Sequence, residues 1–274
     1  MKERLQRPIS PGLRLTAILS FAFIYLPILI VMLYSFNDSK YSLEWKGFTL
    51  KWYTVLAQND LVLDATQNTF ILAVVSTAIA TVLGTLLGYG LHRFKFPGSR
   101  FFQWLMYIPV VTPDIVMAIS LVLTYALLRN LLGPFGTIFD PGLPTMIIAH
   151  VTFEIAFVAI IVRSRLAGLD PALEEAARDL YAGPIETVRH VVLPLALPGI
   201  VSGALLAFTL SIDDFVISFF TSGRLNTLPI LIYSSVKRGI TPDINALSTF
   251  IVLITVVAVA ATNVLRRNTA DRGP

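Results

Sequence analysis

The sequence has 274 residues, of which 55% are hydrophobic and only 14% charged, and its mean hydropathy is +0.74. The apolar residues form long blocks, a composition that excludes an ordinary soluble domain and indicates a membrane protein with several spans. The chain contains no cysteine, which excludes disulfides, zinc-thiolate sites and thiol nucleophiles.

Six segments are apolar and long enough to cross a bilayer, because about 20 helical residues span a hydrocarbon core of about 30 Å. In chain order they are Leu15 to Tyr34, Thr69 to Leu91, Phe101 to Leu128, Met146 to Val162, Leu195 to Phe219 and Ile244 to Leu265. The first resembles a signal peptide in its basic flank, but its apolar run is long and no small-residue cleavage pattern follows, so we expect a retained anchor. These segments predict an all-α membrane protein with six transmembrane helices, forming a single domain over residues 1–274.

An even number of spans places both termini on one side of the membrane, and the basic residues indicate which side. With cytoplasmic termini, 14 of the 21 Lys and Arg residues are cytoplasmic, a two-fold bias that favours this orientation. The net charge of +4 is therefore interpreted as a topology signal, and we expect no nucleic-acid partner. Trp45, Trp52 and Tyr53 then lie in an external segment, in an interfacial aromatic belt or a short surface helix.

Four acidic residues lie within the predicted spans, and no Lys or Arg lies in the middle of any span. They are Asp114, Glu154, Asp213 and Asp214. A charge at the bilayer centre costs about 2.5–3.5 kcal/mol on insertion scales, so such residues usually face a cavity or a partner. We interpret them as candidate substrate-pathway residues for a positively charged cargo; the alternative is a structural role in hydrogen bonding between helices. Asp213 and Asp214 would be about 100° apart on a helix, so we expect one to face the cavity while the other caps backbone or pairs with another subunit.

Two further features of the spans have local interpretations. His150 and Glu154 are four residues apart and share a helix face, but no further ligands lie nearby, so we expect a hydrogen-bonded pair and no metal site. Pro109 and Pro113 interrupt the helical hydrogen bonds ahead of Asp114. That break either borders the pathway or is a simple proline kink.

A charged segment with three prolines separates the fourth and fifth spans, on the cytoplasmic side in the predicted orientation. Asp170 followed by Pro171 is a typical helix start. Leu173, Ala176, Ala177 and Leu180 then form a narrow apolar stripe at helical spacing. Gly183-Pro184 interrupts the helical structure, and a second short helix runs from about Ile185 to His190. Leu193-Pro194 then turns the chain back into the membrane. Periodicity alone leaves two interpretations: a helix that packs on its own bundle, or one that docks on another protein.

This segment, EEAARDLYAGPIETVRHVVLPLALPGI, resembles the cytoplasmic EAA loop of the permease subunits of bacterial type I ATP-binding-cassette (ABC) importers. The family pattern is E-A-A, three residues, Gly, nine residues, Ile, one residue, Leu-Pro. The residues that match at the correct spacing are Glu175, Ala176, Ala177, Val191, Leu193 and Pro194. In the family this glycine supplies the bend between the two short helices of the loop, and we call the bent segment over residues 170–194 the elbow. Tyr181 occupies the glycine position, so either Gly183 provides the bend two residues later or the geometry of the elbow differs.

The resemblance extends to the spermidine/putrescine-type permeases in three further stretches, AHVTFEIAFVAIIVRSRLAGLD, FTLSIDDFVISFFTSG and YSSVKRGITPDINALSTFIV. It implies the type I permease fold, with a core over about residues 69–265 and a coupling loop over 170–194 that docks on an ATPase subunit. The residues of the loop to which it assigns this role are Glu174, Glu175, Ala176, Ala177, Leu180, Gly183, Leu193 and Pro194. The implied partners are two ATPase copies, a second homologous permease, a periplasmic or lipoprotein substrate-binding protein and membrane lipid.

The chain has no phosphate-binding loop of the G-x-x-x-x-G-K-[ST] type, because GTLLGYG lacks the lysine and lies in an apolar span. We therefore expect no cofactor in this chain, with ATP and Mg²⁺ bound by the partner ATPase. Gly84 and Gly88, like Gly199 and Gly203, have the four-residue spacing that lets membrane helices approach closely, so we interpret both pairs as packing sites.

Three functions are compared on this basis. The favoured one is a permease of the bacterial inner membrane that imports a cationic polyamine, without a catalytic site of its own; a permease for another small cationic or organic solute is the alternative. An ion-coupled secondary carrier is less favoured, because we see no inverted repeat of spans and it leaves the cytoplasmic motif unexplained. An intramembrane hydrolase is disfavoured, because H-E-x-x-H, G-x-S-x-G and cysteine nucleophiles are all absent.

Overall fold

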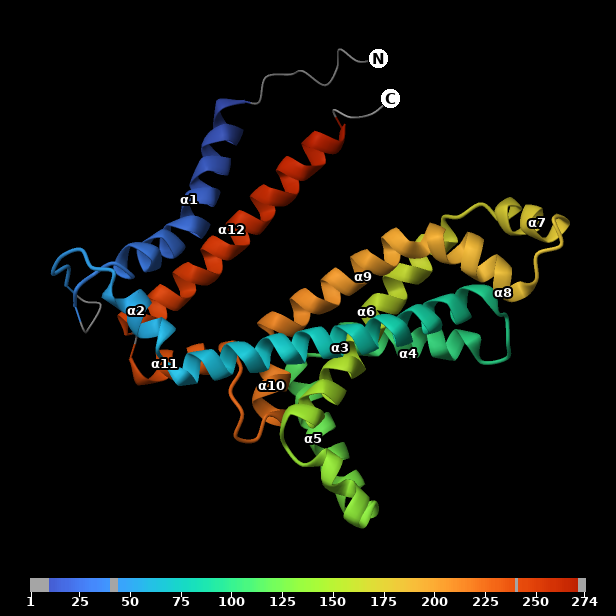
Figure 1. Cartoon of the computed structure of the whole chain (residues 1–274), viewed down its shortest axis with the longest axis horizontal. Helices are drawn as coiled ribbons and strands as arrows, with labels where there is room; N and C mark the ends of the chain where they lie inside the picture. The colour runs from blue at the N-terminus through green and yellow to red at the C-terminus, as the bar shows by residue number, and fades with distance from the viewer. Residues whose placement is uncertain (1–9, 40–43, 240, 271–274) are drawn as a thin grey trace. The chain divides into compact units, whose positions relative to one another are not determined.

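The computed structural model describes residues 10–39, 44–239 and 241–270, and within them the chain is helical apart from loops and one isolated β-bridge (Figure 1). The helices are α1 (Pro11–Tyr34), α2 (Lys51–Ala57), α3 (Asp60–Arg93), α4 (Ser99–Val111), α5 (Asp114–Leu131), η2 (Gly133–Phe139), α6 (Leu143–Ala167), α7 (Ala172–Asp179), α8 (Pro184–Thr187), η3 (Val188–Val192), α9 (Leu193–Asp213), α10 (Val216–Thr221), α11 (Leu228–Arg238) and α12 (Pro242–Ala270). The predicted all-α class is confirmed. Five basic residues used to predict the orientation lie outside the described residues: Lys2, Arg4, Arg7, Lys40 and Arg272.

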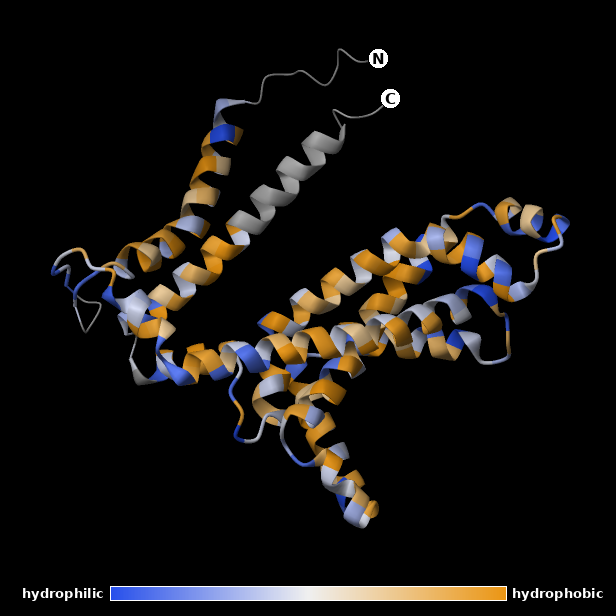
Figure 2. Cartoon of the chain, viewed as in Figure 1, coloured by the Kyte–Doolittle hydropathy of each residue, from blue (hydrophilic) through white to orange (hydrophobic). Residues whose placement is uncertain are grey.

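Five helical segments among the described residues are long and apolar enough to cross a membrane. They are α1, α3, α5, α6 and the segment Pro184–Asp213, which ends with α9. Figure 2 shows hydrophobic residues along these helices and hydrophilic ones around α7 and α8. The sixth predicted span falls on α12, which has 29 residues and is apolar over Pro242–Val256.

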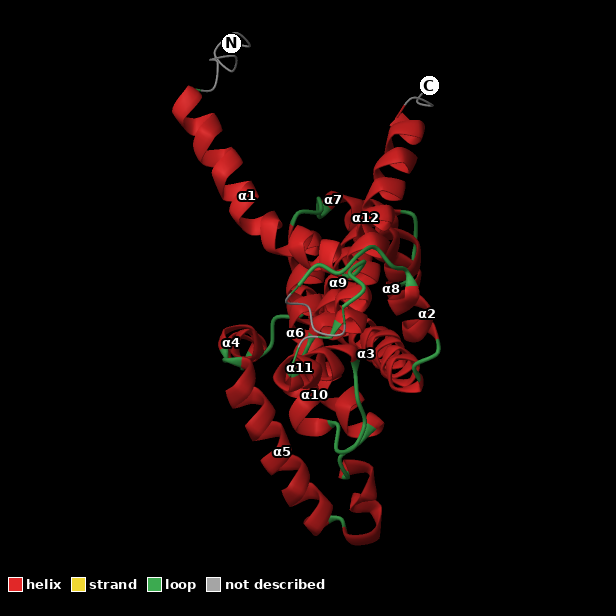
Figure 3. Ribbon diagram, turned by 90° about the vertical axis from the view of Figure 1, so that its left-hand side faces the viewer, coloured by secondary structure: helices red, strands yellow, loops and turns green. Residues whose placement is uncertain are grey.

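The predicted interruption ahead of Asp114 is confirmed, because the segment from Phe101 to Leu128 is divided into α4, which ends at Val111, and α5, which begins at Asp114. Thr112 has an extended backbone (ψ 131°), and Pro113 lacks the N–H that an unbroken helix would use. Pro109 lies inside α4, so the break occurs at only one of the two prolines. Figures 1 and 3 both show α5 leaving the direction of α4 at this point.

The prediction of one continuous span from Leu195 to Phe219 is wrong. Helix α9 ends at Asp213, Asp214 has an extended backbone (ψ 122°), and the short helix α10 follows from Val216. The two aspartates therefore do not share a helix, and the expected 100° between them does not apply. Two of the predicted spans thus break next to an acidic residue.

The described helices fall into two compact units, residues 1–62 with 232–274 and residues 63–231; the single permease domain stays a prediction. In the first unit α1 and α2 contact α12. The segment after α1 is held by polar contacts, with Ser35 Oγ 2.8 Å from Tyr53 Oη and the Trp52 indole N–H donating to Asn37 O at 2.8 Å. Trp52 and Tyr53 lie on α2, which is the predicted short helix.

The second unit is built around α6, which packs along α9 and against α4. Small residues permit the close approaches. A Cβ on Gly84 or Gly203 would contact Val158, with nearest distances of 2.7 and 3.3 Å, and a Cβ on Gly88 would lie 2.7 Å from Ala159 O. Both glycine pairs therefore lie at contacts with α6, as the four-residue spacing predicts.

We expect Gly88→Ala to destabilise the protein by about 1–3 kcal/mol, because the new methyl group would meet the rigid backbone of α6. Gly90→Ala is the matched control. It lies in the same helix with open space around its Cβ position and is expected to be neutral or slightly stabilising. Thermal unfolding of both variants in detergent measures the difference, and equal melting temperatures would contradict the packing role of Gly88.

Candidate functional site

The elbow between α6 and α9 begins with α7. Asp170 Oδ1 accepts a hydrogen bond from Ala172 N at 3.0 Å, so Asp170 caps the start of this helix as predicted. At its end, Tyr181 N donates to Arg178 O at 2.9 Å and Ala182 N donates to Ala177 O at 3.1 Å. This pair of bonds defines a Schellman motif, which requires a left-handed residue between helix and loop.

Tyr181 is that residue, with φ +62°, while Gly183 has φ −66° and ψ 165°. The elbow therefore bends at the position where the resembled family has glycine, and Gly183 does not take over the bend. A left-handed conformation costs a non-glycine residue about 1–2 kcal/mol. The tyrosine side chain is 96% exposed, so within this chain little packing offsets that cost.

Tyr181→Gly is expected to stabilise the end of α7 by about 1 kcal/mol, because glycine adopts the left-handed conformation without steric cost. Hydrogen exchange of the amides of residues 180–182 should slow roughly five-fold, the equivalent of about 1 kcal/mol. Gly183→Ala should leave exchange unchanged, because its φ suits any residue and a Cβ there has space. Faster exchange in Tyr181→Gly would contradict the assigned bend.

The second half of the elbow is helical and continues directly into the membrane. The Glu186 carboxylate accepts a hydrogen bond from Gly183 N at 2.9 Å and caps α8, which passes through the π-helical turn η3 into α9. The predicted turn at Leu193-Pro194 is wrong, because both residues are helical at the start of α9. Pro194 has no N–H to donate to the carbonyl four residues earlier, and the π turn before it accommodates that loss.

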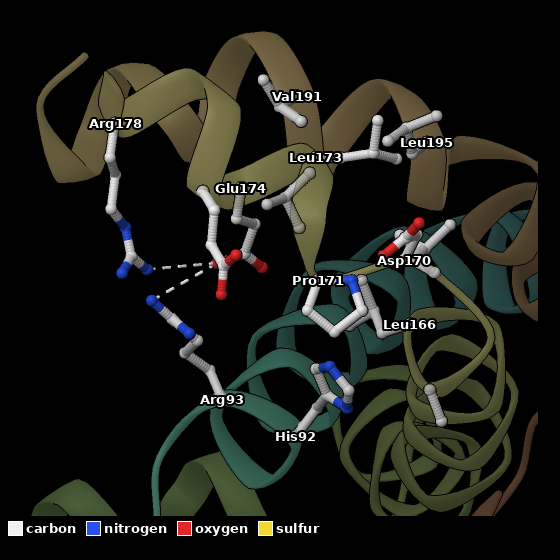
Figure 4. A pocket seen from close by; sticks show the side chains of 14 residues that line it. His92, Arg93, Leu166, Asp170, Pro171, Leu173, Glu174, Arg178, Val191 and Leu195 are labelled. Atoms are coloured by element: carbon white, nitrogen blue, oxygen red, sulfur yellow. Dashed lines mark hydrogen bonds and ion pairs between the residues drawn. The ribbon is translucent and has the colours of Figure 1, made fainter. Parts of the chain in front are cut away.

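Ion pairs attach α7 to the end of α3. Glu174 Oε2 lies 3.3 Å from Arg93 Nη2 and 3.5 Å from Arg178 Nη2, and Figure 4 shows the Glu174 carboxylate between the two arginines. Arg93 is not identifiable from the sequence, since only the fold brings it beside the elbow. These residues line a cavity of about 300 Å³ between α3, α6 and α7, and an adjoining one of about 630 Å³ extends to α8.

The outer surface of the elbow is apolar at its tip and acidic on α7. Leu180 and Ile185 are each 82% exposed, and Glu175 and Ala176 are exposed. Ala177 and Gly183 are half-buried, while Leu193 and Pro194 are exposed on the first turn of α9. The elbow therefore offers exposed leucine, isoleucine and glutamate side chains, and Glu174 is held inward by its arginines.

The four predicted pathway acids separate into two groups. Asp114 and Asp213 are exposed on the isolated chain, each at a helix break. Helices α5 and α10, which begin at these breaks, pack together in an apolar cluster that includes Ala118 and Ile217. Glu154 is fully buried and the Asp214 side chain is only 9% exposed.

The two buried acids belong to one polar network. His150 Nδ1 lies 2.7 Å from Ser211 Oγ, and His150 Nε2 lies 3.0 Å from Ser218 Oγ and 3.3 Å from Asp214 Oδ2. Ser76 Oγ donates to Glu154 Oε1 at 2.9 Å and lies 3.2 Å from Ser211 Oγ, which completes the network.

His150 and Glu154 face each other as predicted, but their closest nitrogen and oxygen atoms are 3.7 Å apart, beyond hydrogen-bond range, and Ser76 and Ser211 connect them. Among the described residues no group of three or more His, Cys, Asp or Glu could hold a metal ion. The two serines give no signal in the sequence, because isolated serines are common in membrane helices.

Comparison with known proteins identifies the family. The pattern of the family described as "Binding-protein-dependent transport system inner membrane component" matches residues 80–272. The chain belongs to this family. It is a multi-pass transport component of the inner membrane, as the sequence predicts, and the family is one of transport permeases and not of enzymes.

Two relatives in this permease family are named for their substrates. The chain is 40% identical over 249 residues to the spermidine/putrescine transport system permease protein PotC of Escherichia coli (strain K12), covering 90% of this chain and 91% of PotC. It is 41% identical over 244 residues to the putrescine transport system permease protein PotI of the same strain, covering 88% and 86%.

Two solved structures with a similar fold contain membrane subunits of ABC transporters. The permease aligns with a chain of a bacterial ABC transporter that imports the acidic polysaccharide alginate, at a TM-score of 0.73 and 19% identity over 93% of this chain and 94% of that one. A chain of the MetNI methionine ABC transporter aligns at a TM-score of 0.60 and 20% identity over 80% and 99%. The predicted type I ABC importer fold is confirmed.

Proposed function

We propose that this permease carries a cationic polyamine of the putrescine or spermidine kind through an ABC importer. The permeases PotC and PotI, which are 40–41% identical to it, are named for these substrates. In this proposal ATP and Mg²⁺ are bound by two copies of a partner ATPase, a second homologous permease completes the pathway, and a periplasmic or lipoprotein binding protein delivers the cargo.

The observation that carries the choice of cargo is the placement of Asp114 and Asp213. Both carboxylates are exposed on this chain at breaks between apolar helices, and no Lys or Arg lies in the middle of the predicted spans. An intramembrane charge needs a partner or water. An ammonium group of the cargo supplies the missing positive charge, so we assign both aspartates to the substrate pathway.

The elbow is the surface to which we assign docking of the ATPase. Exposed Leu180, Ile185 and Glu175 form a surface for the ATPase, while Glu174 links α7 to α3 through Arg93. Movement of the ATPase would then shift α3 and α9 together and alternate the access of the pathway between the two sides. In this proposal the elbow makes no contact with the cargo.

Uptake by the reconstituted complex tests this function. Liposomes with the permease, its sister permease, the ATPase and the binding protein should accumulate labelled putrescine or spermidine only when ATP is enclosed. Liposomes that lack the ATPase are the control. Uptake without ATP would favour the ion-coupled carrier. ATP-driven uptake of other solutes in preference to polyamines would support the assignment as an ABC permease but contradict the polyamine as its substrate.

A further inference from the structure

The geometry points to His150 as the positioning residue that decides which of the two adjacent aspartates faces the cargo. This inference rests on the proposed function, since it concerns the pathway carboxylate Asp213. It adds a residue that touches no cargo and acts through Asp214.

His150 is fully buried in α6 and uses both ring nitrogens. Nδ1 bonds Ser211 Oγ of α9 at 2.7 Å, and Nε2 faces α10, with Ser218 Oγ at 3.0 Å and Asp214 Oδ2 at 3.3 Å. The Phe153 ring packs beside the imidazole, with centroids 5.4 Å apart. A buried polar ring with partners on both sides has one orientation, because turning it would leave polar atoms unpaired.

Asp214 is fixed by donors from two directions. Its Oδ2 accepts a hydrogen bond from Ser218 N at 2.7 Å and its Oδ1 accepts from Ile217 N at 3.3 Å, so the carboxylate caps the first turn of α10. His150 Nε2 approaches the same Oδ2 from α6. The imidazole therefore holds Asp214 toward the interior of the second unit.

The direction of Asp213 follows from that of Asp214. Asp213 is the last residue of α9, and the extended backbone at Asp214 starts the break. With Asp214 held inward, at 9% exposure, the neighbouring Asp213 is exposed on the outside of the chain. Loss of the Nε2 contact would free Asp214 to leave its capping position and would change the orientation of Asp213.

The network also anchors the break to the rest of the second unit. Ser211 contacts Ser76 of α3, which donates to Glu154 of α6 at 2.9 Å. Four helices thus meet in one set of buried polar contacts. Since the Nδ1 side stabilises the packing and the Nε2 side contacts Asp214, the two sides of the ring can be tested separately.

Two amide substitutions separate these roles. His150→Gln keeps a donor near the position of Nε2, and His150→Asn keeps one near the position of Nδ1 and does not reach Asp214. The native chain has no cysteine, so Asp213→Cys provides the single labelling site of this chain, and the labelling of this subunit is read after it is separated from its partners. The probe is a methanethiosulfonate reagent with a quaternary ammonium group, applied to the assembled complex in liposomes.

We expect His150→Asn to reduce the labelling rate of Asp213→Cys at least five-fold and His150→Gln to stay within two-fold of the His150 protein. In transporters that retain Asp213, His150→Asn should raise the apparent KM for putrescine while the ATPase co-purifies at the parental ratio, and His150→Gln should restore the KM. A merely structural role predicts equal effects of the two amides. Equal labelling in all three proteins would overturn the inference.

The test of the positioning role of His150 can fail or succeed independently of the test of polyamine transport. If Asp213→Asn leaves polyamine uptake unchanged, Asp213 is not a cargo contact, yet the labelling rates still decide whether His150 positions it. If His150→Asn cannot be purified while His150→Gln can, Asp214→Ala replaces it as the variant that lacks the contact. Its labelling rate should fall as much as predicted for His150→Asn, and an unchanged rate would overturn the inference.

Discussion

Asp213→Asn is expected to raise the apparent KM for putrescine by roughly ten- to hundred-fold in ATP-driven uptake. The substitution removes the charge but keeps the shape of the side chain, and a hydrogen bond to a charged group contributes about 1.5–3 kcal/mol. Asp213 is exposed at the end of α9, so the loss should affect cargo binding more than folding. Initial rates over a range of putrescine concentrations, with melting temperatures of the same preparations, measure both effects.

Asp213→Glu is the matched control, because it keeps the carboxylate and should retain most of the uptake. Asp214→Asn provides the contrast. That carboxylate accepts backbone hydrogen bonds from Ile217 and Ser218, so its main expected effect is a lower stability, by about 1–3 kcal/mol. If Asp213→Asn carried putrescine with parental KM and rate, the assignment of Asp213 to the pathway would be wrong.

The sequence predicts the helices well because a bilayer imposes their length and apolar character. Each predicted span coincides with a helix, or with two helices divided by a break. The glycine pairs are predicted for a related reason: close approach of two membrane helices favours residues without a side chain, and Gly88 and Gly203 both lie against α6.

The break ahead of Asp114 is indicated by its prolines, whereas the break after Asp213 is harder to predict because average hydropathy does not register it. The segment around Asp213 stays apolar on both sides, and only the contacts of the Asp214 carboxylate with α10 and His150 explain where α9 ends. Pro194 illustrates the opposite error. Proline predicts a turn, but the π-helical turn η3 before Pro194 accommodates its missing N–H, and the chain continues into α9.

The polar network depends on residues far apart in the chain. Ser76, His150 and Ser211 come from three helices, and their sequence positions carry no sign that they meet. The bend of the elbow has a local cause, the left-handed backbone of Tyr181. A tyrosine in this conformation is uncommon, so the sequence points to the nearby Gly183 as the bend. Both features require the fold to be known.

Glu175, one of the exposed acids of the elbow, is expected to govern attachment of the ATPase. Glu175→Lys should weaken binding of the ATPase by roughly thirty-fold or more, since reversing a charge at a protein interface costs about 2 kcal/mol or more. Glu175 is exposed on α7, whereas Glu174 beside it is paired with Arg93 and Arg178. Glu175 lines the open cavity beside Glu174, but the ion pairs that hold α7 to α3 are made by Glu174, so the reversal at Glu175 changes an exposed charge and leaves those pairs in place.

Co-purification of the ATPase with tagged permease, at several salt concentrations, measures the effect. Asp179→Lys is the matched control: it makes the same change of charge at an exposed acid of the same helix, so a general electrostatic effect would appear in both variants. Glu174→Lys should differ from both, because it opposes Arg93 and Arg178 and should loosen α7 itself, which faster hydrogen exchange would report. Recovery of the ATPase at the parental ratio with Glu175→Lys would show that this face of α7 does not bind it, and docking would then have to rest on the apolar tip formed by Leu180 and Ile185.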